Sequence, residues 1–227
     1  MAPRAQYGQD RFVIELLGGK RGGYFFDVGA SNGIDTSNTL LLEREFGWTG
    51  LCVEANLRFY QQLARDRRCR TLNACLYDRV ADVEFLEAAG TLGGVLDDFT
   101  APQMAWAVKI RGLPLDGDGR PPLVAKRSMT VQAALDLAGA PPVIDYWSLD
   151  VEGAELKLLQ SFPFGRYAFD VLTVEHNRRA ARGAIREFLE PRGYERITSF
   201  VIDDCYIRTA AFPTRHSRSA VWRRRPF

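Results

Sequence analysis

The chain has 227 residues, of which 46% are hydrophobic and 26% are charged, and its formal net charge is +2. It is long enough to bury a full core as one domain, or as one domain with an insertion. No apolar run reaches the roughly 18–20 residues of a membrane span, and the first ten residues lack the apolar stretch of a signal peptide.

Two further features bear on compartment and partners. The four cysteines form no CxxC pair and have no metal-ligand spacing, which favours reduced core residues in a cytoplasmic protein. From residue 178 to 227 there are twelve Arg against five Asp or Glu. This surplus suits either a nucleic-acid partner or a solvated surface. In the basic tail that starts near residue 210, no aromatic residue is interleaved with the arginines apart from Trp222 beside Arg223, so the sequence favours the solvated surface.

The first part of the chain alternates strand and helix patterns. A short helix is expected over residues 9–17, where apolar residues cluster before Gly18 and Gly19. Later helices are expected where a capping residue precedes an apolar pattern and a glycine or charged turn follows it. The expected strands are 24–28, 50–54, 70–74 and 83–86, and the expected helices between them are 37–46 and 58–66.

Residues 88–127 interrupt this alternation. Glycine, proline and aspartate are frequent there, with scattered large apolar residues such as Phe99, Trp106 and Ile110. A long loop inside a compact domain is usually a lid, a binding loop or a disordered segment. The interleaved aromatic residues favour a lid or an acceptor-binding insertion.

The alternation returns after residue 130. The expected helices are 131–138, 153–161 and 180–190, and the expected strands are 143–149, 169–174, 194–198 and 204–208. The last two strands are close enough in sequence to form an antiparallel pair. The pattern predicts a single α/β domain over residues 1–227, with a mostly parallel seven-stranded sheet, helices on both faces and a terminal antiparallel pair.

The most informative motif joins the first two strands. An apolar run ends at Asp27 and opens into the turn 29–33, Gly-Ala-Ser-Asn-Gly, and a second apolar run ends at Glu54. Such a turn lets backbone N–H groups approach a ligand, and the second acid can accept both ribose hydroxyls. Dinucleotides and S-adenosylmethionine both suit this arrangement. The spacing G-x-G-x-x-G, which admits a pyrophosphate, is absent, so the motif favours S-adenosylmethionine, which has no phosphate.

Polar residues also follow the later strands. Asp150 and Glu152 follow the strand 143–149, and Glu175, His176 and Asn177 follow the strand 169–174. Asp150 could instead cap the next helix, and His176 could be a structural imidazole. Three consecutive polar residues after a buried strand nevertheless need polar partners or a ligand. Ligands of such sheets bind at the carboxyl ends of the strands.

Taken in order, these motifs resemble the FkbM family of class I S-adenosylmethionine-dependent methyltransferases. The segments that carry the resemblance are Tyr-Gly-Gln-Asp at 7–10, residues 26–33, Ser-Asn-Thr at 37–39, residues 47–54, Asn-Ala at 73–74, residues 144–155 and Val-Glu-His-Asn at 174–177.

The resemblance implies a Rossmann-like fold and an O-methyltransferase that acts on a hydroxyl of a small molecule, such as a natural product or a sugar. It implies that the turn holds the methionine end of the cofactor, that Glu54 holds the ribose, and that the residues after the third strand flank the adenine. The cofactor-binding residues expected on this basis are Asp27, Gly29, Ser31, Asn32, Gly33, Glu54, Asn73, Ala74 and Asp150.

Methylation of a hydroxyl requires alignment of the acceptor oxygen and removal of its proton. We expect His176 to be the base, with Asp150 and Glu152 orienting it or the acceptor. In a variant of this hypothesis, Asp150, Glu152 and His176 hold Mg²⁺ or another divalent ion that lowers the pKa of the hydroxyl. Two alternatives stay open: a nucleic-acid-modifying methyltransferase that uses the Arg-rich C-terminal region, and a non-catalytic cofactor-binding module.

Overall fold

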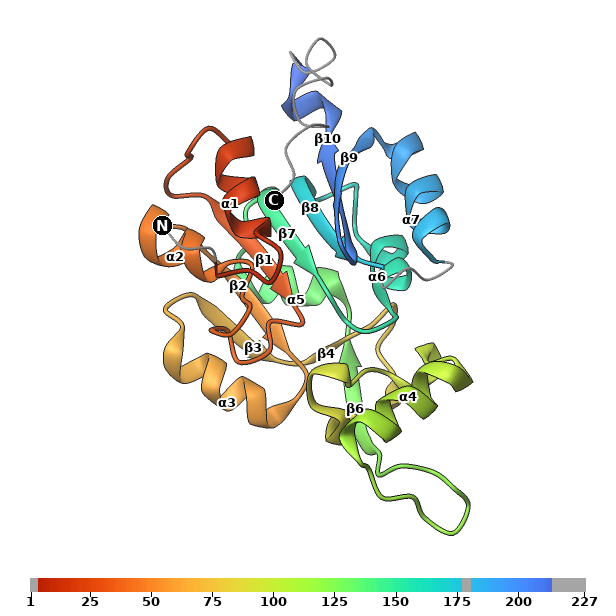
Figure 1. The fold of residues 1–227 in the computed structure, drawn as a ribbon. Coiled ribbons are helices and arrows are strands. Elements are labelled where there is room, and N and C mark those ends of the chain that lie inside the picture. The colour runs from red at the N-terminus through yellow and green to blue at the C-terminus, as the bar shows by residue number, and fades with distance from the viewer. Residues whose placement is uncertain (1–3, 177–180, 214–227) are drawn as a thin grey trace.

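The computed structural model describes residues 4–176 and 181–213. Its centre is a seven-stranded sheet with the order β3-β2-β1-β7-β8-β10-β9 (Figure 1). The first five strands in this order are parallel, and β10 runs antiparallel to both β8 and β9. The strands are β1 (Tyr24–Val28), β2 (Thr49–Glu54), β3 (Arg70–Asn73), β7 (Val143–Leu149), β8 (Ala168–Glu175), β9 (Tyr194–Phe200) and β10 (Asp203–Arg208). The predicted α/β fold with a terminal antiparallel pair is confirmed.

Helices cover both faces of this sheet. One face is covered by α1 (Gln9–Leu16), α2 (Leu40–Phe46) and α3 (Leu57–Asp66), which pack on alternate side chains of the strands. The other face is covered by α5 (Val131–Ala138), α6 (Glu155–Ser161) and α7 (Ala181–Leu189). None of the helices in the described ranges is long and apolar enough to cross a membrane.

The core beneath the strand tips is rich in aromatic rings. Trp147 on β7 is fully buried, and its ring centroid lies 5.4 Å from that of Phe26 on β1 and 5.1 Å from that of Phe162. Phe169 on β8 meets the same indole edge-on at 5.3 Å. Aromatic pairs at these distances are more stabilising than their area alone implies. The strands that carry the functional residues therefore rest on a well-packed base.

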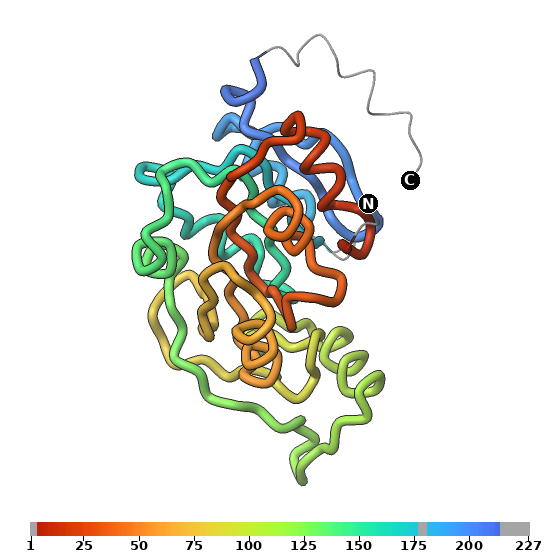
Figure 2. The backbone as a smooth tube through the Cα atoms, turned by 90° about the vertical axis from the view of Figure 1, so that its left-hand side faces the viewer, coloured from red at the N-terminus to blue at the C-terminus, as the bar shows by residue number. Residues whose placement is uncertain are grey.

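The segment expected to be a long loop is largely ordered, which corrects that expectation. It contains two 3₁₀ helices, η1 (Glu87–Leu92) and η2 (Leu96–Asp98), then α4 (Ala101–Arg111) and β6 (Val124–Met129). β6 pairs with β5 (Asp82–Phe85) and with β4 (Cys75–Leu76) in a second, three-stranded sheet. Figures 1 and 2 show α4 and the loop that follows it projecting from one end of the molecule.

The helix α4 has signals that an apolar-periodicity argument overlooks. Thr100 caps it, and the side chain of Gln103 bonds back to the Thr100 N–H in a capping box. Pro102 occupies the first turn, where a missing N–H costs nothing, and Gly112 ends the helix in a left-handed conformation. The helix is therefore specified by its ends and only weakly by an apolar face.

Candidate active site

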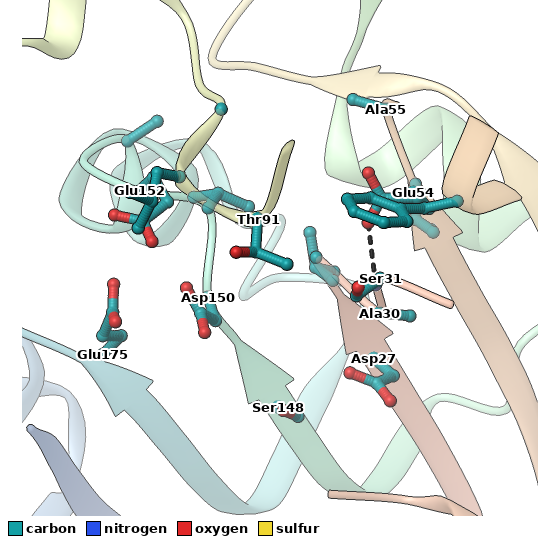
Figure 3. Close-up of a pocket in the computed structure, with 18 of the residues that line it drawn as sticks. Asp27, Ala30, Ser31, Glu54, Ala55, Thr91, Ser148, Asp150, Glu152 and Glu175 are labelled. Atoms are coloured by element: carbon teal, nitrogen blue, oxygen red, sulfur yellow. Dashed lines mark hydrogen bonds between the residues drawn. The ribbon is translucent and has the colours of Figure 1, made fainter. Parts of the chain in front are cut away.

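A cavity of about 700 Å³ opens at the carboxyl ends of β1, β2, β7 and β8. Figure 3 shows acidic side chains from these strand ends around it. The acids that line it are Asp27, Asp35, Glu54, Asp150, Glu152, Glu175 and Asp203. No lysine, arginine or histidine of the described part of the chain belongs to its lining. The cavity therefore favours cationic groups over anions.

The turn after β1 brings the backbone to the cavity wall. Gly29 has φ 82°, and a Cβ at this position would lie 1.6 Å from the carbonyl oxygen of Asp150. The N–H groups of Gly29 and Ala30 donate to the Val53 carbonyl at 3.0 and 3.1 Å. The close approach of Gly29 to the Asp150 carbonyl brings together the main chains that follow β1 and β7. Only glycine at position 29 permits it.

Glu54 at the end of β2 faces the turn. Its Oε2 accepts a hydrogen bond from the Ser31 N–H at 2.8 Å, and its Oε1 accepts one from the Asn56 N–H at 2.7 Å (Figure 3). Burial raises the pKa of Glu54 above its ordinary value, although these two hydrogen bonds act to lower it. The carboxyl group is thus fixed in orientation at the cavity wall.

A buried network supports Asp27 from below the cavity. The Thr39 hydroxyl donates to Asp27 Oδ2 at 2.6 Å, and Arg67 donates to Thr39 Oγ1 at 3.0 Å. Arg67 also pairs with Glu43 at 3.2 Å and donates to the carbonyl of Gly33 at 3.2 Å. Burial raises the pKa of Asp27 despite these contacts. Sequence reasoning missed Arg67, because it lies at the end of α3, far from every motif.

Several predicted cofactor residues shape the site without lining it. Asn32 Oδ1 accepts from the N–H groups of Ile34 and Asp35, which closes the turn. The Asn73 amide donates to the Glu54 carbonyl at 2.8 Å and so fixes the chain after β2. Gly33 and these two asparagines are not among the lining residues, whereas the remaining predicted cofactor residues are.

Three non-glycine residues in the described ranges have positive φ, and all of them line the cavity. They are Ser31 at 49°, Thr36 at 55° and Glu152 at 60°. Side chains other than glycine rarely adopt this backbone region, and such strain concentrates at functional sites. Its position here supports the cavity as the site of function.

The acids of β7 and β8 form the opposite wall. Asp150 follows β7, and α6 begins only at Glu155, so the Asp150 side chain does not cap that helix. Asp150 is exposed at the cavity surface, but desolvation by the protein atoms around it, and then the charges of Glu152, Asp203 and Glu155, raise the pKa of its carboxyl group. Burial and the neighbouring acids also raise the pKa of Glu175, to about 12. Sequence reasoning noticed Glu175 only as a neighbour of His176.

His176 lies away from the cavity wall. Its Nε2 is 3.7 Å from Asp204 Oδ1, and its backbone N–H donates to the Ile202 carbonyl at 2.8 Å. It is buried and is not among the lining residues. Its role as a base therefore stays a prediction. The neighbouring Asn177 lies outside the described residues.

The structure brings together a different acidic set from the predicted metal ligands Asp150, Glu152 and His176. Oxygen atoms of Asp150, Glu155 and Glu175 all lie within 4.8 Å of one another. Glu155 Oε1 accepts hydrogen bonds from the backbone at Val151 and Gly153, at 3.1 and 3.0 Å. Glu155 is therefore the one carboxylate of these three that the main chain is shown to hold in place.

The irregular segment supplies the rim of the cavity. Residues 90–93 and Val95 line it from η1 and the connection to η2, and Gln103 and Trp106 line it from α4. Trp106 is 53% exposed, although a large apolar ring is usually buried. The placement agrees with the expectation of an acceptor-binding insertion, which stays a prediction.

A family model identifies the chain. The model of the methyltransferase FkbM domain matches residues 27–196, which is more than half of the chain. The chain belongs to the FkbM methyltransferase family. Membership supports methyltransferase activity with S-adenosylmethionine as the methyl donor. None of the curated proteins matches the FkbM chain.

Solved structures resemble the FkbM chain at low identity. A precorrin-6Y C5,15-methyltransferase from Geobacter metallireducens GS-15 is 11% identical, with a TM-score of 0.46, over 87% of this chain and 86% of that one. A human methyltransferase 10 domain containing protein is 10% identical, with a TM-score of 0.44, over 91% of this chain and 83% of that one.

Proposed function

We propose that the protein transfers a methyl group from S-adenosylmethionine to a hydroxyl of a small molecule, a natural product or a sugar. The observation that carries this proposal is the division of one cavity into two walls. The turn after β1 and Glu54 form one wall, and the acids of β7 and β8 form the other (Figure 3). A cofactor on the first wall would direct its methyl group toward the second.

The residues of the first wall fit S-adenosylmethionine. Glu54 offers a carboxylate to the ribose hydroxyls. Asn38 Oδ1 is buried and has no hydrogen-bond partner in the described part of the chain, so it suits the methionine ammonium group. The lining residues Ala55, Leu76 and Phe85 provide an apolar surface for adenine. When bound, the cofactor supplies an electrophilic methyl group on a sulfonium.

The second wall suits removal of a proton from a hydroxyl. We propose Asp150 as the base, because it lines the cavity, whereas His176 does not. A raised pKa makes a carboxylate a stronger base, which favours proton transfer near neutral pH. Glu152 and Glu175 would orient the acceptor beside it. Alignment of the acceptor oxygen with the methyl group would supply much of the rate.

The charge of the cavity argues against a nucleic-acid acceptor. A phosphate backbone would meet acidic lining residues and no basic one in the described ranges. Several C-terminal arginines are also paired internally: Arg182 and Arg196 with Asp204, and Arg208 with Asp170. The basic tail beyond residue 213 lies outside the described residues. None of the four cysteines forms a disulfide, which supports our proposal of a cytoplasmic protein.

The experiment that tests this function has two stages. Calorimetry with S-adenosylhomocysteine tests the cofactor, and a null result together with binding of NAD(H) would overturn it. Transfer of a labelled methyl group is then measured with a panel of neutral polyols, aminated polyols and phenols, and with RNA as a comparison. Labelled ether products support the proposal. Transfer to RNA alone, or binding without transfer to any hydroxyl, would contradict it.

A further inference from the structure

Oxygen atoms of Asp150 and Glu175 lie within 4.8 Å of each other, and neither carboxyl group forms an ion pair within the described residues. Glu175 is 5% exposed, and its buried Oε2 has no hydrogen-bond partner in the described residues. Two facing carboxylates need either a shared proton or a cation between them.

The charge of the surrounding acids favours a cation. Glu152 and Asp203, two further acids, line the same cavity as this pair. No lysine or arginine of the described residues lines the cavity. Figure 3 shows the carboxyl groups of Glu175 and Glu152 directed toward each other, with Asp150 beside them. An acidic wall of this kind attracts a divalent cation.

The spacing of the oxygen atoms matches a hard divalent ion. Oxygens of Asp150, Glu155 and Glu175 lie within 4.8 Å of one another. Mg²⁺ and Ca²⁺ bind carboxylate oxygens at roughly 2.0–2.6 Å, so two ligands of one ion are separated by at most about 4–5 Å. All three candidate ligands are carboxylates, which such ions prefer over soft metals.

The site also has a rigid anchor and an entrance. Glu155 is held by the backbone N–H groups of Val151 and Gly153, so its carboxyl group does not need to be ordered on binding. Asp150 is exposed to the cavity, which gives an ion a route from solvent. Asp150 can bind an ion through one oxygen and face an acceptor hydroxyl with the other.

We propose that Asp150, Glu155 and Glu175 form a binding site for one divalent cation of the Mg²⁺, Mn²⁺ or Ca²⁺ class. The site adjoins the proposed acceptor position, but it rests on the carboxylates alone and not on the proposed reaction. A cation there would ionise the carboxyl pair and lower the pKa of a hydroxyl bound to it. This ligand set replaces Glu152 and His176 of the sequence prediction with Glu155 and Glu175.

A titration of the metal-stripped full chain with Mn²⁺ alone tests this proposal. Binding is followed by electron paramagnetic resonance. We expect saturable binding of one Mn²⁺ per chain, competed by Mg²⁺ and at least tenfold weaker in Glu175→Gln and in Asp150→Asn. The matched control is Glu187→Gln, which removes an exposed carboxylate of α7 and should bind as the wild type does. Far-UV circular dichroism and binding of S-adenosylhomocysteine establish that each variant is folded.

The outcomes separate this inference from the proposed function. Absence of saturable binding to the folded wild type, or equal affinity in Glu175→Gln, overturns the cation site. Mn²⁺ binding that follows the expected pattern supports it, even if no hydroxyl is ever methylated. Methyl transfer that proceeds unchanged in EDTA, together with no Mn²⁺ binding, overturns the cation site and leaves the proposed function intact.

Discussion

Asp150 and Glu175 follow two neighbouring parallel strands at the same level. β7 and β8 pair Leu149 with Val174, the residues immediately before the two acids. Parallel pairing therefore sets two carboxyl groups side by side, and the burial of Glu175 limits the access of water to its carboxyl group. The strand register thus explains both the acidity of this wall and the perturbed pKa values.

The base assignment predicts unequal effects of two substitutions. Asp150→Asn should lower kcat by at least about 100-fold, because the proposed proton acceptor is removed. His176→Gln should lower it by less than about tenfold, since His176 lies beside Asp204. Turnover of labelled S-adenosylmethionine with an acceptor found in the panel measures both. A large loss in His176→Gln with little loss in Asp150→Asn would restore His176 as the base.

Glu175→Gln should stabilise the metal-free protein, and increasingly so at higher pH. The folded chain holds a proton on Glu175 because burial and the neighbouring acids raise its pKa to about 12, whereas the unfolded chain releases it near pH 4.5. Because the pKa of Glu175 is higher in the folded than in the unfolded chain, the wild type keeps its full stability below the unfolded pKa. Above that pH, its free energy of unfolding declines as the pH rises. Near pH 4 the two proteins should therefore be equally stable.

At pH 8 in EDTA, we expect the variant to exceed the wild type by up to about 5 kcal/mol in free energy of unfolding, which is about 1.4 kcal/mol for each pH unit above the unfolded pKa. Urea denaturation at both pH values measures the difference. A constant difference across this range would show that the Glu175 proton is not held as described.

Glu54→Gln should weaken cofactor binding and leave the fold intact. The amide keeps one acceptor for the backbone N–H groups of Ser31 and Asn56 but loses the charge offered to the ribose. We expect S-adenosylhomocysteine to bind about 10–100-fold more weakly, as when a charged hydrogen bond is lost. Calorimetry compares it with Glu84→Gln, an exposed change on β5 that should have no effect. Equal affinities would remove Glu54 from the cofactor site.

Gly29→Ala should be far more damaging than Gly47→Ala. Both glycines have positive φ, 82° and 68°, so alanine strains the backbone at either position. A Cβ at Gly47 meets nothing within 4 Å, whereas one at Gly29 meets the Asp150 carbonyl. We expect about 1 kcal/mol of destabilisation for Gly47→Ala and about 3 kcal/mol or more for Gly29→Ala. Thermal unfolding of both variants measures the contrast, and similar losses would contradict the close contact.

The elements around the cofactor turn were predictable because their signals are local. β1 spans the expected residues 24–28, and α2 ends before Gly47 as expected, although it begins at Leu40 instead of residue 37. α4 and β6 were not predicted, because α4 is marked by its caps and β6 pairs with strands distant in sequence. Local periodicity contains neither kind of information.

The choice between Glu175 and His176 shows a different limit. Successive residues of an extended chain point to opposite sides, so only one of the two can face the cavity. Chemistry favours an imidazole as a base at neutral pH, and this preference directed the sequence prediction to His176. The orientation depends on how β10 pairs with β8, where Asp203 lies opposite Glu175. That pairing is a tertiary property.

The contact between Gly29 and Asp150 joins the two walls of the cavity through main chain alone. Its spacing is consequently insensitive to which side chains surround it, as long as residue 29 has none. Acceptor-facing side chains could then be exchanged, by evolution or by an engineer, while the distance from the donor turn to the transfer position is conserved. New acceptor selectivity in this scaffold should therefore arise most readily from substitutions that leave this glycine in place.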